Sequence, residues 1–115
     1  RFQRGGYGRL VAVNVQPPLP ASRFVSRAMI RDYHARQSEQ ALAPARRLAE
    51  TLGVPLECRT LIDEPAAAIV RCARAARGDE IVMGTRGLGR WRGLILGSTA
   101  TKVVQFATVP VTLVK

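Results

Sequence analysis

The chain is poor in the residues from which catalytic and metal centres are most often built. It contains a single histidine, His34, and two cysteines, Cys58 and Cys72. No metal cluster or His-Asp-Ser set can be assembled around one histidine, so we expect an ordinary surface or core residue on a solvent-facing stretch of helix. Two cysteines do not make a disulfide framework. We expect reduced core thiols, with a disulfide between them as the alternative.

Long apolar runs and acidic side chains are also scarce. No run approaches the roughly 18 apolar residues of a membrane span, no signal peptide is visible, and a membrane is not an expected partner. Only 8 acidic side chains stand against 18 basic ones, nearly all arginine, and the formal net charge is +10. The excess indicates either a solvated arginine-biased surface or attraction of anions. Aromatic residues make up 5% of the chain, which argues against a nucleic-acid partner.

What the chain does contain is an alternation of strand and helix patterns. Residues 9–15 form a nearly continuous apolar run, typical of a strand covered on both faces. Three prolines predict a loop over residues 16–21. Residues 26–52 have helical periodicity with Gly53 at the C-cap position. The predicted buried stripe of this helix is Ala41, Ala45, Leu48 and Leu52.

The second half of the chain continues the alternation. Asp63 is predicted to cap a helix, with Pro65 in its first turn. An edge strand is predicted at 54–62 before this helix, and Gly78 is predicted at the end of the helix. A strand at 81–83, a long loop, another helix and an edge strand at 109–114 follow. The predicted buried stripe of the last helix is Ala100, Val103, Val104 and Ala107. This order predicts one α/β domain over residues 1–115, with a parallel, doubly wound, Rossmann-like sheet.

The stretch from Glu80 to Thr101, EIVMGTRGLGRWRGLILGSTAT, carries the strongest functional signal. A short apolar strand leads into a loop rich in glycine and arginine, and a helix is predicted to begin at Gly97-Ser98-Thr99. Glycines allow main-chain amides to approach an anion closely, and a helix start adds free N–H groups and the positive end of the dipole. The stretch is neither a Walker A loop nor the dinucleotide fingerprint. It predicts a site for an anionic, phosphate-bearing ligand.

The spacing Gly84-x-x-Gly87, nine residues, then Gly97-Ser98 resembles the nucleotide-binding loop of the universal stress protein family. The last helix and the last strand, VPVTLVK, also resemble the end of that family's domain, and the similarity covers nearly the whole chain. The resemblance implies the adenine nucleotide alpha hydrolase-like version of the Rossmann-like fold. It also implies a cytoplasmic, commonly dimeric protein that acts in stress responses.

The ligand implied by the resemblance is ATP or another adenine nucleotide, with or without Mg. Hydrolysis is weak or absent in the family, so a binding module is expected rather than an enzyme, and no catalytic or metal-binding residues are assigned. A homodimer is expected through the strand at 109–114. The implied nucleotide-binding residues are Val15, Met83, Gly84, Arg86, Gly87, Gly97, Ser98 and Thr99.

The chain departs from the family pattern at its start. Nothing matches the family's first strand and most of its first helix, which carry an acidic residue that contacts the nucleotide. The absent strand is central in the family's sheet, between the strands predicted at 9–15 and 81–83. Neither of those two is built as an edge, so we expect them to be unpaired with each other. We expect an upstream segment or another chain to fill the gap.

Three alternatives stay open beside a nucleotide-binding stress protein. One is a basic domain that binds nucleic acid, which would need arginines clustered with aromatic residues on one face. Another is a stress or scaffold protein that binds no nucleotide, because the acidic contact is missing. The third is an ATP-hydrolysing enzyme, for which the residues present offer no metal-binding acid.

Overall fold

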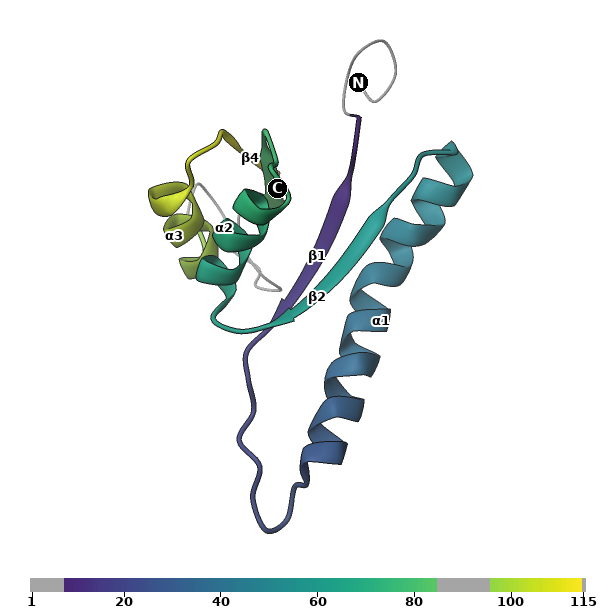
Figure 1. The fold of residues 1–115 in the computed structure, drawn as a ribbon, viewed down its shortest axis with the longest axis vertical. Coiled ribbons are helices and arrows are strands. Elements are labelled where there is room, and N and C mark those ends of the chain that lie inside the picture. The colour runs from purple at the N-terminus through teal and green to yellow at the C-terminus, as the bar shows by residue number, and fades with distance from the viewer. Residues whose placement is uncertain (1–7, 85–95, 115) are drawn as a thin grey trace. The chain divides into compact units, whose positions relative to one another are not determined.

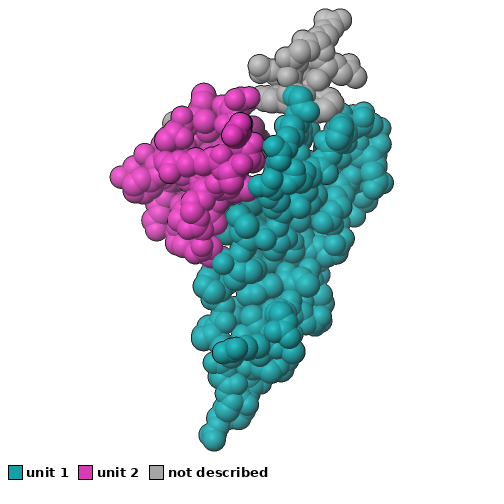
Figure 2. Space-filling model, viewed as in Figure 1, with its two compact units in different colours: residues 1–62 teal, residues 63–115 magenta. Residues whose placement is uncertain are grey.

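A computed structural model describes residues 8–84 and 96–114 (Figure 1). Its elements are, in chain order, β1 (Val11–Gln16), α1 (Arg27–Leu52), β2 (Glu57–Ile62), α2 (Pro65–Ala75), β3 (Ile81–Gly84), α3 (Ser98–Phe106) and β4 (Val111–Val114). The predicted alternation of strands and helices is therefore confirmed. The chain forms two compact units, residues 1–62 and 63–115 (Figure 2), and each has its own two-stranded parallel sheet.

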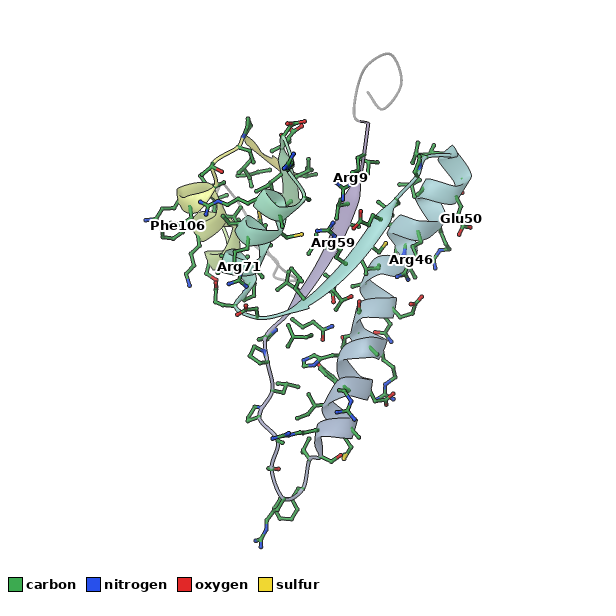
Figure 3. All side chains as sticks on the ribbon, in the orientation of Figure 1. Arg9, Arg46, Glu50, Arg59, Arg71 and Phe106 are labelled. Carbon is green, nitrogen blue, oxygen red and sulfur yellow. The ribbon has the colours of Figure 1, made fainter. Side chains whose placement is uncertain are left out.

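In unit 1, β1 and β2 pair in parallel, from Val11 opposite Glu57 to Gln16 opposite Ile62. Glu57 accepts from both Arg9, at 2.9 Å, and Arg59, at 2.6 Å. Figure 3 shows Arg9, just before β1, and Arg59, on β2. The bonds to these arginines lower the pKa of the Glu57 carboxyl, with Arg9 as the larger cause. One face of the sheet thus carries a charged cluster.

Helix α1 begins and ends with caps that the sequence supplies. The Ser26 hydroxyl accepts from the Met29 amide at 3.1 Å, which satisfies one of the free amides of the first turn. Gly53 ends the helix in the left-handed conformation, at φ 69, as predicted. The helix runs through Pro44 as one element of 26 residues.

The predicted buried stripe of α1 is wrong. Leu48 and Leu52 are 59% and 63% exposed. The residues that α1 buries are instead His34, Ser38, Leu42 and Ala49. Two of these four are polar, which is why a search for apolar periodicity selected the wrong face.

The polar buried face of α1 meets polar side chains on the sheet. The Gln16 amide nitrogen donates to the His34 main-chain carbonyl at 2.8 Å, and the Ser38 hydroxyl bonds the hydroxyl of Thr60. His34 is 8% exposed, and its Nε2 lies 3.2 Å from the carbonyl oxygen of Pro17. The expectation of a solvent-facing position for His34 is therefore wrong, because hydrogen bonds compensate for its burial.

In unit 2, β3 and β4 pair in parallel, with Ile81 opposite Val111. Helices α2 and α3 pack against each other, and Ala68 and Val103 are fully buried, at 0% exposure. Val104 is 47% exposed, so its predicted place in the buried stripe of α3 is wrong. Val82 is also exposed, so β3 is not covered on both faces as expected.

The end of α2 shows an unusual backbone choice. Arg77 donates its amide to the Arg74 carbonyl at 3.0 Å, and Gly78 donates to the Ala73 carbonyl at 2.8 Å. This pair of bonds is the Schellman motif, whose left-handed position is usually glycine. Here Arg77 takes that position, with φ 54, and Gly78 follows it. The helix therefore ends near the predicted glycine, but the strain falls on the arginine.

Within the described residues, β1 pairs only with β2 and β3 only with β4. β1 belongs to unit 1 and β3 to unit 2, so the expectation that these two strands are not paired with each other stays a prediction. Whether a further strand fills the gap stays a prediction. Cys58 and Cys72 form no disulfide, as expected.

Candidate functional site

The start of α3 is the part of the predicted phosphate site that the structure describes. Gly97 is the N-cap residue, and its conformation is extended, at φ -65 and ψ 163. The first helical bond runs from the Thr101 amide to the Gly97 carbonyl at 3.0 Å. Gly97 supplies no side-chain cap, and no side chain of residues 8–84 or 96–114 accepts from the amides of the first turn. This helix end therefore offers main-chain N–H donors and the positive end of the dipole to an anion.

Ser98 and Thr99 occupy the first two helical positions of α3. Because Gly97 is the cap, the Ser98 side chain does not cap the helix. Ser98 is exposed and Thr99 is half-buried. The hydroxyl of Ser98 is therefore accessible beside the free amides, an arrangement that fits phosphate oxygens.

The start of α2, in the same unit, is already filled by a carboxylate of the chain. The Glu64 side chain accepts from the amides of Ala66, at 3.3 Å, and Ala67, at 2.8 Å. These bonds, with the Ala67 amide as the largest cause, lower the pKa of the Glu64 carboxyl. Glu64, rather than the predicted Asp63, is the cap, because Pro65 already occupies the first turn and fixes the preceding residue as the cap.

Lys102 links the beginnings of the two helices. Its Nζ, in the second turn of α3, lies 3.8 Å from the Glu64 Oε1 at the start of α2. Both helix starts thus lie at the same end of unit 2, with one capped by a carboxylate and the other uncapped. Asp63 accepts from the Glu64 amide at 2.7 Å and pairs with Arg71. Both acids therefore stabilise the start of α2.

The remaining predicted nucleotide-binding residues fall in three places. Met83 and Gly84 end β3 in unit 2, with Met83 half-buried and Gly84 exposed. Val15 lies half-buried in β1, which belongs to unit 1. Arg86 and Gly87 lie outside the described residues. Of the eight, five are therefore described together in unit 2, on the two elements that flank the loop.

A polar pocket in unit 1 was not anticipated from the sequence. It has a volume of about 220 Å³ and lies where β1 ends. The Gln16 amide nitrogen donates to the Asn14 Oδ1 at 2.9 Å as well as to the His34 carbonyl at 2.8 Å, so the Gln16 amide is hydrogen-bonded within the pocket wall. The only sequence feature that could have indicated this pocket is the pair of amide side chains, Asn14 and Gln16, at the end of an apolar strand. The lining residues are Asn14, Gln16, Pro17, Leu19, Tyr33, His34, Gln37 and Ala41.

The model of the universal stress protein family matches residues 5–115. The chain belongs to this family. It is 37% identical over 108 residues to a universal stress protein of Thermus aquaticus, "in QAH/OAS sulfhydrylase 3'region", with coverage of 93% of this chain and 77% of that protein. It is 32% identical over 106 residues to universal stress protein MJ0531 of Methanocaldococcus jannaschii, with coverage of 92% of this chain and 62% of that protein.

Solved structures of similar fold agree with this assignment. The hypothetical protein MJ0577, the subject of a structure-based assignment of biochemical function, aligns with a TM-score of 0.75 at 19% identity over 93% of this chain and 75% of that chain. A universal stress protein from Archaeoglobus fulgidus aligns with a TM-score of 0.65 at 26% identity, over 91% of this chain and 76% of that chain. The Rossmann-like α/β fold predicted for this family member is thereby confirmed.

Within residues 8–84 and 96–114, no three or more His, Cys, Asp or Glu side chains gather where they could hold a metal ion. No helix in the same ranges is both long and apolar enough to span a membrane.

Proposed function

We propose that this universal stress protein is a cytoplasmic adenine-nucleotide-binding module that acts in the cellular stress response. The observation that carries the proposal is the uncapped start of α3, which follows the glycine-rich loop directly. Its free amides and helix dipole suit a phosphate group. ATP or another adenine nucleotide is the ligand that the family resemblance implies.

The roles of the individual residues follow from their positions. The amides of Gly97, Ser98 and Thr99 and the Ser98 hydroxyl would donate to phosphate oxygens. Met83 and Gly84 would line the ribose and phosphates, and the main chain of Val15 would hold the adenine edge. Arg86 would add positive charge, Gly87 would allow close approach, and Mg would accompany the phosphates or be dispensable.

Binding, rather than hydrolysis, is the proposed activity. Glu64 is the carboxylate that reaches α3, through Lys102 at 3.8 Å. It is already engaged with two main-chain amides, and its lowered pKa makes it a weak general base. At most, slow hydrolysis of bound ATP is expected.

The sharpest test removes one main-chain donor without disturbing the helix. Proline is tolerated at the first helical position, where its missing N–H breaks no helical bond, and Pro65 already occupies that position in α2. Ser98→Pro should therefore fold normally and bind ATP about ten-fold or more weakly, since hydrogen bonds to charged groups contribute about 1.5–3 kcal/mol.

Ser98→Ala is the matched control, because it removes the hydroxyl and keeps the amide. Titration calorimetry with ATP should rank the affinities as wild type, then Ser98→Ala, then Ser98→Pro. Equal ATP affinity for wild type and a folded Ser98→Pro variant would count against the site. A labelled oligonucleotide at two salt concentrations tests the nucleic-acid alternative in the same experiment.

A second variant tests the glycine-rich loop. Gly87→Val should weaken ATP binding without unfolding the chain, because a β-branched side chain would hold the backbone away from the phosphates. Gly8→Val is the control, since a Cβ at Gly8 meets nothing within 4 Å. The loop assignment fails if both variants bind ATP as tightly as wild type.

The proposed assembly is a homodimer through β4. This strand pairs only with β3 among the described strands, and its Val114 is 50% exposed. An apolar edge of this kind is normally protected by a partner. Val111→Glu or Leu113→Glu should convert the dimer to monomer in light scattering, whereas Thr108→Glu, outside the strand, should not. A wild-type protein that is monomeric at tens of micromolar excludes this dimer.

A further inference from the structure

One end of unit 1 carries a cluster of positive charge. It consists of the loop after β1 and the first turns of α1, residues 17–33, here named the α1 tip (Figure 1). From residue 17 to residue 31 the sequence has no Asp or Glu, and it has three arginines: Arg23, Arg27 and Arg31. None of the three is in an ion pair with a described residue. The first acid, Asp32, pairs with Arg36 at 3.2 Å.

The positive charge of the α1 tip lies at the start of α1, the end of a helix at which cations are unfavourable. Arg27 is the first residue of α1, and no acidic residue occupies the first turn. Cations near a helix start are disfavoured, because they meet the positive end of the dipole. The arginines and the dipole therefore add to one positive potential that the chain itself does not neutralise.

The same segment exposes large apolar side chains. Phe24 is 81% exposed and Met29 is 56% exposed. Leu19, Val25 and Tyr33 are also among the exposed large apolar residues. The Arg23 guanidinium lies 5.8 Å from the centre of the Phe24 ring, so charged and apolar groups are interleaved.

The turn that presents Phe24 is ordered by its own hydrogen bonds. The Ser22 amide donates to the Val25 carbonyl at 2.9 Å. The Ser22 hydroxyl accepts from the amides of Phe24 and Val25, both at 3.2 Å. Arg23 and Phe24 thus lie at the tip of a closed turn directly before the Ser26 cap of α1, which fixes their exposure.

We propose that the α1 tip docks on a membrane surface that carries anionic lipid headgroups. Arginines would contact the headgroups, while Phe24 and the aliphatic side chains would enter the boundary of the acyl region. A nucleic acid would use the arginines and the aromatic rings but not Leu19, Val25 and Met29, because aliphatic side chains do not stack on bases. Docking of this kind takes place at the membrane surface and needs no membrane-spanning helix.

Co-sedimentation of the full chain with vesicles tests the proposal. The chain should bind phosphatidylcholine vesicles that contain phosphatidylglycerol, but not pure phosphatidylcholine, and added salt should weaken binding. Each tip arginine changed to glutamine should weaken binding about five-fold, and the three together about one hundred-fold. Phe24→Ala, which keeps the charge, should weaken it about ten-fold.

The control changes the net charge equally at other places. Arg47, Arg74 and Arg77 are exposed residues outside the α1 tip, and the triple change to glutamine there should leave most of the binding intact. Circular dichroism confirms that each variant is folded. The proposal is overturned if both triple variants lose binding equally, if Phe24→Ala binds as wild type, or if an oligonucleotide binds the tip and anionic vesicles do not. ATP binding, followed in parallel, should stay unchanged in the tip variants.

Discussion

Arg77 offers the most direct test of how the backbone of unit 2 is built. It holds φ 54 at the left-handed position of the Schellman motif that ends α2. A residue with a Cβ loses roughly 1–2 kcal/mol in this conformation, and glycine does not. We therefore expect Arg77→Gly to stabilise the fold.

The size of the gain follows from two opposing effects. Removal of the strain is worth roughly 1–2 kcal/mol, while glycine adds about 0.4–1 kcal/mol of entropy to the unfolded chain. The expected net stabilisation is about 0.5–1 kcal/mol, which for a chain of this size raises the melting temperature by about 4 °C. Arg77→Asn should give a smaller gain, because asparagine tolerates this conformation better than most residues.

Arg74→Gly is the matched control for this prediction. Arg74 lies inside the last turn of α2, where glycine should destabilise the helix by about 1 kcal/mol. The same substitution three residues apart should thus have opposite signs. Arg77→Ala separates charge from backbone, because it removes the guanidinium and keeps the strain, and it should change stability by less than about 0.5 kcal/mol.

Urea titrations followed by circular dichroism provide the measurement, with the slope compared between variants to show that the unfolding transition is the same. If Arg77→Gly is destabilised as much as Arg74→Gly, the left-handed strain does not control stability at this position. If Arg77→Ala stabilises as much as Arg77→Gly, the gain comes from the lost charge rather than from the backbone.

Three further predictions concern the core, a second helix end and pH. Val103→Ala should destabilise the fold by about 2 kcal/mol, while Val104→Ala should have an effect within about 0.5 kcal/mol, because the two are 0% and 47% exposed; equal losses in urea titrations would contradict this burial. Gly53→Ala should destabilise by about 1 kcal/mol, since φ is 69 and a Cβ there meets no atom within 4 Å, and a neutral result would refute the conformational argument. The pKa of the Glu64 carboxyl is lowered from 4.5 chiefly by the hydrogen bond from the Ala67 amide. The stabilisation that the ionised carboxylate gives is therefore present above pH 4.5 and is lost as the pH falls through the lower pKa of the folded state. Melting temperatures of Glu64→Gln should depend less on pH in this range than those of wild type, and parallel profiles would exclude this contribution.

The order of elements could be predicted from sequence because each strand and helix carries its own periodic signal. Gly53 and the start of α3 at Gly97 were placed correctly, since glycine and the residues around it have strong local preferences. The buried face of α1 was not, because His34 and Ser38 are polar and are buried through hydrogen bonds to partners distant in sequence. Apolar periodicity cannot detect such pairs.

The candidate site was predicted only in part for similar reasons. The free amides at the start of α3 follow from a glycine loop before a helix, which is a local pattern. The cap of α2 was misplaced by one residue, because both Asp63 and Glu64 are capable acceptors and Pro65 decides between them. The tip of α1 was missed, because its arginines and exposed apolar residues form a cluster only when the turn at Ser22 closes.

The hydrogen bonds under α1 have a consequence for how the helix is aligned on its sheet. If the contact between α1 and its sheet were purely apolar, α1 could slide by one turn at little cost. In this protein such a slide would break both the hydrogen bond of Gln16 to His34 and that of Ser38 to Thr60. Each buried polar group left without a partner costs about 1–3 kcal/mol. These hydrogen bonds therefore fix the register of α1 on its sheet, as a buried polar residue sets the register of a coiled coil. Through them, the strand residue Gln16 determines where the loop before α1 can lie.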